Sequence, residues 1–98
     1  MSQQLLKQEM TVSQILRVHG KRFTQIQKKY SDGHNGRCAI GVIVSYYGWD
    51  GKHKSDAAIR LAFRALEVAG IDIDMVMQLN DSGATFGDIA DYLDRNGK

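Results

Sequence analysis

The chain has no proline, a single cysteine (Cys38) and no long apolar run in its 98 residues. A single cysteine cannot form an internal disulfide, so nothing in the sequence points to an oxidising compartment. The densest apolar run covers residues 39–44, far short of the roughly 20 residues that cross a bilayer. Residues 1–10 lack the charged and then apolar order of a secretory signal. We therefore expect a cytoplasmic protein that makes no use of a membrane.

Composition and length favour a single domain over residues 1–98. Hydrophobic residues make up 43% of the chain and charged residues 24%, which are ordinary values for a globular protein. A chain of this size buries roughly 60–70% of the surface that its unfolded form exposes, enough for a core without disulfide or metal crosslinks. Because proline is absent, glycine-rich segments such as 31–36 and 48–51 mark the loops.

The net charge differs in sign between the two halves of the chain. Residues 1–54 contain nine Lys and Arg against three Asp and Glu, a net charge of +6, whereas residues 55–98 contain four against eight, a net charge of −4. Such an asymmetry either attracts the halves to each other, within one chain or across a homodimer, or marks a nucleic-acid-binding face. The total of +2 is small for a nucleic-acid-binding protein, which favours attraction between the halves.

The first predicted helix spans residues 11–30. Thr11 and Gln14 fit a capping box at its start. Apolar residues follow at steps of three and four, namely Val12, Ile15, Leu16, Phe23, Ile26 and Tyr30. Gly20 interrupts the pattern, so a bend or break is expected there. Residues 1–10 either extend this helix or fray.

A second helix is predicted over residues 55–69, where Ser55 fits an N-cap and Gly70 a stop. Its apolar residues form two stripes, one of which includes Leu61 and Val68, and leave only a narrow polar edge. A helix that is apolar on most sides is surrounded by its neighbours, so we expect this one to be central.

The last predicted helix spans residues 85–95. Thr85 and Asp88 fit a second capping box, which makes Thr85 a structural residue. Asp91 and Arg95 are four residues apart, a spacing at which opposite charges pair on a helix.

Residues 39–47 and 71–79 fit either strands or helices. The first segment is rich in valine, isoleucine and tyrosine, which favours a strand. In the second, apolar residues alternate with mostly polar ones, which is also a strand pattern. The competing interpretation makes Asp74 the N-cap of a short helix. The pattern alone slightly favours two strands.

Cys38 is the residue to examine for catalysis. It follows a loop and opens one of the candidate helices, whose N-terminus, together with Arg37, would lower the pKa of the thiol. A nucleophilic cysteine also needs a base, and no spacing identifies one among His19, His34 and His53. A lone cysteine is more often a small buried residue. His34 and Cys38 are four residues apart, but no second pair of ligands follows, so we expect no metal and no cofactor.

Basic and aromatic residues of the N-terminal half form two candidate binding regions. The first is a basic stripe on the first helix that could contact phosphates, made of Arg17, Lys21 and Lys28. The second combines aromatic and basic side chains, as binding of single-stranded nucleic acid or a partner protein requires, and contains Tyr47, Trp49, Lys52 and Lys54. Large aromatic side chains more often anchor a core, so packing is the competing interpretation.

Three short segments follow one another in a recognisable order: Arg37-Cys38-Ala39-Ile40-Gly41, Leu79-Asn80-Asp81 and Thr85-Phe86-Gly87-Asp88-Ile89-Ala90-Asp91. They resemble a loose group of small uncharacterised bacterial, archaeal and phage proteins with a Cys-Ala-x-Gly segment, a later Leu-Asn-Asp segment and a Thr/Ser-Phe-x-x-Ile-Ala-Asp helix. The group is alanine-rich after the cysteine, so the resemblance implies a helix over 38–47 and, by extension, over 74–81. This chain departs from the group at residues 42–44, Val-Ile-Val, which keeps the strand interpretation open.

The resemblance implies no activity. It suggests that Cys38, Asn80 and Asp81 are structural residues, with Cys38 packed at a helix start. Asn80 and Asp81 would then bond the turn that leads into the last helix.

Together these observations predict a compact all-α domain of four to five helices, with an α+β fold that pairs strands near 39–46 and 71–79 as the alternative. The leading functional hypothesis is a small non-enzymatic regulatory or adaptor module that binds another protein. The second is a nucleic-acid-associated protein that uses its basic N-terminal half, and the third is a cysteine-dependent enzyme built on Cys38.

Overall fold

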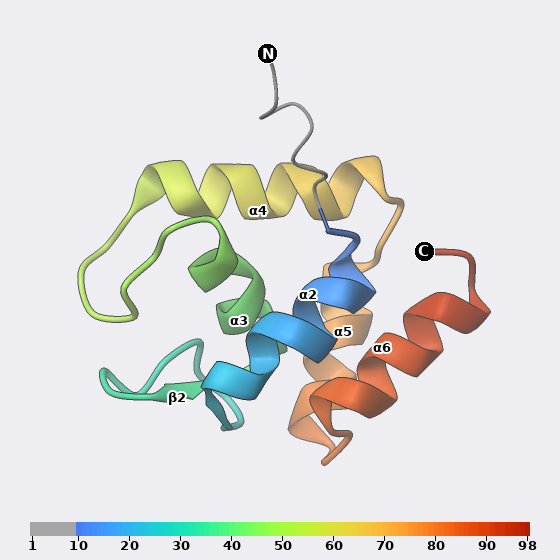
Figure 1. The fold of residues 1–98 in the computed structure, drawn as a ribbon, viewed down its shortest axis with the longest axis horizontal. Helices are drawn as coiled ribbons and strands as arrows, with labels where there is room; N and C mark the ends of the chain where they lie inside the picture. Colours follow the sequence, from blue (N-terminus) through green and yellow to red (C-terminus); the bar gives the residue numbers. More distant parts are fainter. Residues whose placement is uncertain (1–9) are drawn as a thin grey trace.

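The computed structural model describes residues 10–98, and this part of the chain is mostly helical. Five α-helices, one 3-10 helix and one pair of short strands follow one another in it (Figure 1). In chain order they are α2 (Val12–Val18), η1 (His19–Arg22), β1 (Thr24–Gln25), β2 (Gly36–Arg37), α3 (Ala39–Tyr46), α4 (Asp56–Val68), α5 (Ile73–Asp81) and α6 (Phe86–Arg95). None of these described helices is long and apolar enough to cross a membrane.

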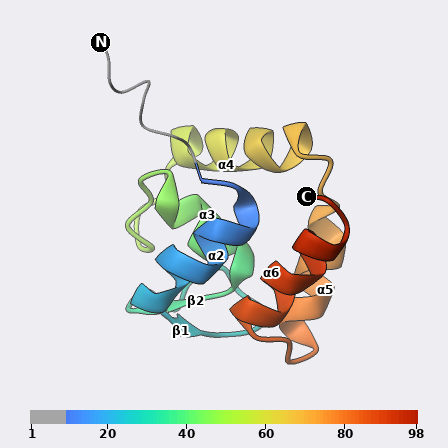
Figure 2. The same cartoon turned by 45° about the vertical axis from the view of Figure 1, so that its right-hand side comes forward.

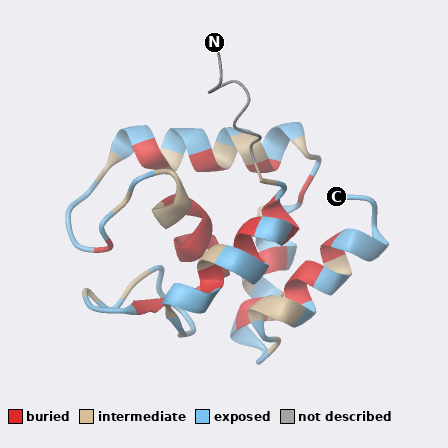
Figure 3. Ribbon diagram, in the orientation of Figure 1, coloured by how far each residue is buried: buried red, intermediate tan, exposed pale blue. Residues whose placement is uncertain are grey.

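Helix α3 lies at the centre of the core. Every residue from Ala39 to Val44 is buried, and α3 packs against α2, α4 and α5 (Figure 3). Helix α6 packs against both α2 and α5 (Figure 2). The large side chains that are fully buried come from all five helices, and include Ile15, Leu16, Ile40, Ile43, Leu66, Val76, Ile89 and Leu93.

The expectation that residues 55–69 form the central helix is wrong. Helix α4 runs along one edge of the molecule (Figure 1) and buries only Ala58, Ala62 and Leu66. The two large residues of its second apolar stripe face outward, with Leu61 52% exposed and Val68 77% exposed. The central place belongs to α3, because its first six residues have no polar side chain to keep in water.

The first helix is much shorter than the predicted 11–30. It ends at Val18, continues as the 3-10 turn η1, and becomes extended from Phe23. The buried Gly20 allows this turn to approach α6, since a Cβ there would stand 2.8 Å from the Phe86 ring. Beyond it, the predicted apolar face does not form, and Tyr30 is 41% exposed.

The segment after η1 is held by backbone pairing with residues 35–37. Strands β1 and β2 are parallel, with Thr24 opposite Gly36 and Gln25 opposite Arg37. Further bonds extend the pairing, because Ile26 N donates to the Arg37 carbonyl. The all-α prediction is therefore correct for most of the described chain but misses this short sheet.

The two ambiguous segments are helices, so the predicted strands near 39–46 and 71–79 are wrong. They form α3 and α5, as the resemblance implied. Helix α5 begins two residues earlier than expected, because its N-cap is Asp72 rather than Asp74. The Asp72 carboxylate accepts hydrogen bonds from the backbone N–H groups of Asp74 and Met75.

The predicted caps of the other helices are confirmed. Helices α2 and α6 begin with complete capping boxes, Thr11 with Gln14 and Thr85 with Asp88. At the start of α4, Ser55 accepts a hydrogen bond from the Ala58 backbone N–H.

Candidate functional site

Cys38 is the N-cap of α3, and its position opposes the reactivity that the sequence suggested. The side chain is 5% exposed, and its sulfur accepts a hydrogen bond from the Gly41 N–H at 3.4 Å. Burial raises the pKa of the thiol and outweighs the lowering by nearby backbone N–H groups. The hollow that reaches Cys38 holds only about 90 Å³, whereas ligand pockets usually measure roughly 300–1,000 Å³.

Within residues 10–98, no hydrogen bond joins a histidine side chain to Cys38. His19 packs edge-on against Phe23 and Tyr46, and burial lowers its pKa, with the charge of Arg22 as a smaller cause. His53 is exposed and bonds the carboxylate of Asp50 at 2.8 Å. Within residues 10–98, no three His, Cys, Asp or Glu side chains are grouped to hold a metal ion.

Asn80 is 1% exposed, and its side chain bonds three residues in two segments distant from it in sequence. Its carbonyl oxygen accepts from the Ala39 N–H at the start of α3 and from the Gln25 side chain, at 3.0 and 2.8 Å. Its amide donates to the Ile26 carbonyl at 2.8 Å. The neighbouring Asp81 accepts from the Lys28 N–H at 2.8 Å.

The expectation that the side chains of Asn80 and Asp81 bond the turn into the last helix is therefore wrong. Both side chains reach back to residues 25–39 instead. The link to α6 is made by Gln25, which donates to the Ala84 carbonyl and accepts from the Phe86 N–H. Sequence reasoning missed Gln25, because a lone glutamine carries no pattern.

Arg37 is a buried cation, 4% exposed, that the sequence reasoning considered only as a neighbour of Cys38. Its guanidinium donates to the Ser45 hydroxyl at 2.9 Å, and to the carbonyls of His34 and Asp50 at 2.8 and 3.1 Å. It also stacks over the Phe23 ring at 4.5 Å. Arg37 thus holds the loop over residues 31–36 beside the turn at 48–51.

The predicted basic stripe is divided by the fold. Arg17 forms ion pairs with Asp91 and Asp94 of α6, both at 2.7 Å, so Asp91 does not pair with Arg95 as predicted. Lys21 lies in η1 and Lys28 lies beyond β1, and both are exposed.

The predicted aromatic and basic region is also divided. Trp49 is half-buried against the core, and its indole N–H donates to the His53 carbonyl at 2.8 Å. Lys52 and Lys54 are exposed in the loop that follows. Tyr47 is half-buried and lines a groove elsewhere, beside α4.

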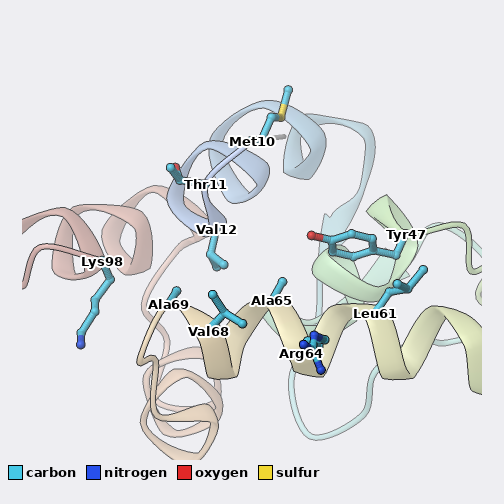
Figure 4. Close-up of a pocket in the computed structure, with 10 residues that line it drawn as sticks. All are labelled: Met10, Thr11, Val12, Tyr47, Leu61, Arg64, Ala65, Val68, Ala69 and Lys98. Carbon is cyan, nitrogen blue, oxygen red and sulfur yellow. The ribbon is translucent and has the colours of Figure 1, made fainter. Parts of the chain in front are cut away.

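This groove, of about 460 Å³, lies between the start of α2 and α4, and we call it the α2–α4 groove (Figure 4). Its lining is mostly apolar and consists of Met10, Thr11, Val12, Tyr47, Leu61, Arg64, Ala65, Val68, Ala69 and Lys98. Figure 4 shows Val12 pointing toward α4, with Tyr47 toward one end and Lys98 toward the other.

The sequence did contain the signal for this groove. The stripe with Leu61 and Val68 is visible as a pattern, but a pattern does not say whether an apolar stripe is covered by the same chain. Comparison with protein-family models, with curated proteins and with solved structures finds no match to this chain.

Proposed function

We propose that the chain is a non-enzymatic module that binds another protein, and that the α2–α4 groove is its binding site. The observation that carries the proposal is the outward row on α4, in which Val68 is 77% and Leu61 52% exposed. Both side chains border the same groove. Exposed apolar surface gathered in one place is typical of an interaction site.

The energetics support a binding role. Fully burying a leucine or valine side chain contributes roughly 1.5–3 kcal/mol, so covering this row supplies a substantial share of a micromolar binding free energy. Tyr47 borders the same groove, and tyrosine is over-represented among the side chains that dominate binding energy.

The environment of Cys38 supports a function without covalent chemistry. Its pKa is raised by burial, which lowers the thiolate fraction at neutral pH. No histidine bonds it in the described chain, since His19 packs on aromatic rings and His53 bonds Asp50.

A second candidate function is nucleic-acid binding at the end of the molecule built from residues 21–54. One observation favours it: Ser31 donates to the Gly51 carbonyl at 2.8 Å, which holds two loops with exposed cations side by side. The cations on these loops are Lys28, Lys29, Lys52 and Lys54, and Lys21 and Arg22 are further exposed cations in η1. Binding to mixed-sequence DNA or RNA should then weaken with salt by a log–log slope of about −0.9 per phosphate contact on duplex DNA. No binding at low salt would remove this candidate.

The groove proposal is tested by capture with matched variants. Proteins are captured from a nuclease-treated extract of the cells that make this chain. Three tagged baits are compared, namely the full chain, its Val68→Asp variant and its Gln78→Asp variant. Gln78 is exposed on α5, away from the groove, and serves as the control. We expect at least one protein whose capture falls about tenfold or more with Val68→Asp and is unchanged with Gln78→Asp. Equal capture by all three chains would contradict the proposal.

A further inference from the structure

We infer that the occupant of the α2–α4 groove is an amphipathic helix of a different protein, which places a carboxylate against Arg64. This inference rests on the proposed function and names the chemistry of the partner. It is carried by the spacing of the exposed row on α4 and by the charge at its edge.

The spacing of the row fits a helix. Leu61 and Val68 are seven residues apart, which is two helical turns or roughly 10 Å along α4. Ala65 lies between them and lines the groove, leaving room for an incoming side chain. A partner helix with apolar residues three, four and seven positions apart presents the same spacing.

The charge at the groove is of one sign. Arg64 lies midway between Leu61 and Val68, lines the groove, and is exposed. In residues 10–98 it takes part in none of the ion pairs or side-chain hydrogen bonds. Lys98 is a second cation on the groove, and none of the lining residues within 10–98 is acidic. An anionic occupant is therefore complementary, and an arginine fork suits a carboxylate.

The same arginine disfavours a second copy of this chain. In a two-fold dimer through this row, each copy presents the same surface to the other. Because Arg64 stands at the midpoint of the row, the two guanidinium groups would face each other, and like charges placed opposite are repulsive. A partner of different sequence avoids this repulsion.

The test is a selection of displayed helical peptides with randomised exposed positions, carried out on the full chain and on Arg64→Glu and Leu61→Asp. Arg64 and Leu61 are both exposed, and circular dichroism checks that both variants fold. We expect the full chain to enrich peptides with apolar residues three, four and seven positions apart and a Glu or Asp near the middle. Those peptides should bind Arg64→Glu about tenfold or more weakly, with recovery when the peptide acid is changed to lysine, and they should not bind Leu61→Asp.

The outcomes separate the two proposals. Apolar peptides without acidic bias, lost on Leu61→Asp but unaffected by Arg64→Glu, would overturn the inference and leave the proposed function standing. No enrichment over Leu61→Asp would overturn both. Sedimentation of the full chain measures its oligomeric state. A dimer that Leu61→Asp dissociates would identify a second copy as the occupant of the groove and overturn the inference.

Discussion

At the scale of single residues, the Asn80 side chain connects segments that are distant in sequence. One side chain bonds the start of α3, the side chain of Gln25 and the carbonyl of Ile26. All of these groups lie in or beside the core, where an unpaired polar group is costly.

Replacing Asn80 with alanine should lower the free energy of unfolding by about 2–3 kcal/mol, since it leaves the Ala39 N–H and the Ile26 carbonyl without their partner. Urea denaturation of both proteins measures the change. Gln78→Ala, in the same helix but exposed, is the control and should change stability by less than about 0.5 kcal/mol. A loss below about 1 kcal/mol for Asn80→Ala would refute the role assigned to this side chain.

Residues whose role depends on local sequence could be predicted, and residues whose role depends on distant partners could not. The N-cap side chains accept hydrogen bonds from backbone N–H groups three residues later, a spacing that can be seen in the sequence; these residues are Cys38, Ser55 and Thr85. Arg37 and Gln25 act across turns, and their partners become visible only when the chain is folded.

At the scale of elements, α3 is approached closely by the chain before it. Gly41 lies against the Tyr30 carbonyl, so that a Cβ at this position would overlap the carbonyl oxygen. The same carbonyl accepts the N–H of Cys38 at 3.3 Å. Glycine at 41 therefore lets α3 and the residue 30 backbone lie side by side.

Two glycine-to-alanine substitutions in helices should have opposite effects. Gly41→Ala should destabilise the protein by about 3 kcal/mol or more, because backbone must move to admit the methyl group. Gly87→Ala in α6 meets only the Thr85 hydroxyl, at an ordinary contact distance of 3.8 Å, and should stabilise by up to about 1 kcal/mol, because alanine favours the helix. Thermal unfolding of the two variants compares them, and similar changes in both would show that the approach at Gly41 is not tight.

The start of each helix was more predictable than its end or the elements that pack around it. Capping boxes give the starts of α2 and α6, but α2 ends where Gly20 meets Phe86, a residue 66 positions away. Helix α3 lacks a polar face, so pattern alone resembled a strand, and the resemblance to alanine-rich segments was needed to predict a helix there.

At the scale of the whole molecule, charge joins the two halves of the chain. Arg17 of α2 bonds Asp91 and Asp94 of α6, which agrees with attraction between the halves within one chain. These pairs are exposed, so each contributes little by itself. Each half also contains a carboxylate whose ionised form is favoured by the fold, Asp50 in the basic half and Asp94 in the acidic half.

Acid should destabilise the protein in two stages. Burial lowers the pKa of His19, so its contribution is present above the ordinary histidine pKa of about 6.5 and is lost as the pH falls below it. Hydrogen bonds from His53 and Lys52 lower the pKa of Asp50, and those from Ser13 and Arg17 lower that of Asp94. Their contributions are present above about pH 4 and are lost below it.

Melting temperatures between pH 8 and pH 2.5 measure both stages. Asp50→Asn should reduce the fall below pH 4, because the amide keeps an acceptor and does not titrate in this range. Glu67→Gln, an exposed carboxylate outside these contacts, is the control. A melting temperature that rises on acidification from pH 6 to pH 3 would contradict the direction of these shifts.

The groove is a property of the whole molecule, so the apolar stripe of α4 that the sequence shows did not by itself reveal it. Its lining comes from the start of α2, the end of α3, one side of α4 and Lys98. The composition of α4 predicted apolar contact for Leu61 and Val68, but only the packed chain leaves those side chains uncovered.

The most direct test of the central claim is photo-crosslinking in the cells that make the protein, with a benzophenone amino acid at position 68 or at position 52. Val68 stands on the groove and Lys52 lies in the basic loop. We predict a discrete protein adduct from position 68 that Leu61→Asp removes, and no such adduct from position 52. Adducts from position 52 alone, to protein or to nucleic acid, would contradict the claim that the α2–α4 groove is the binding site.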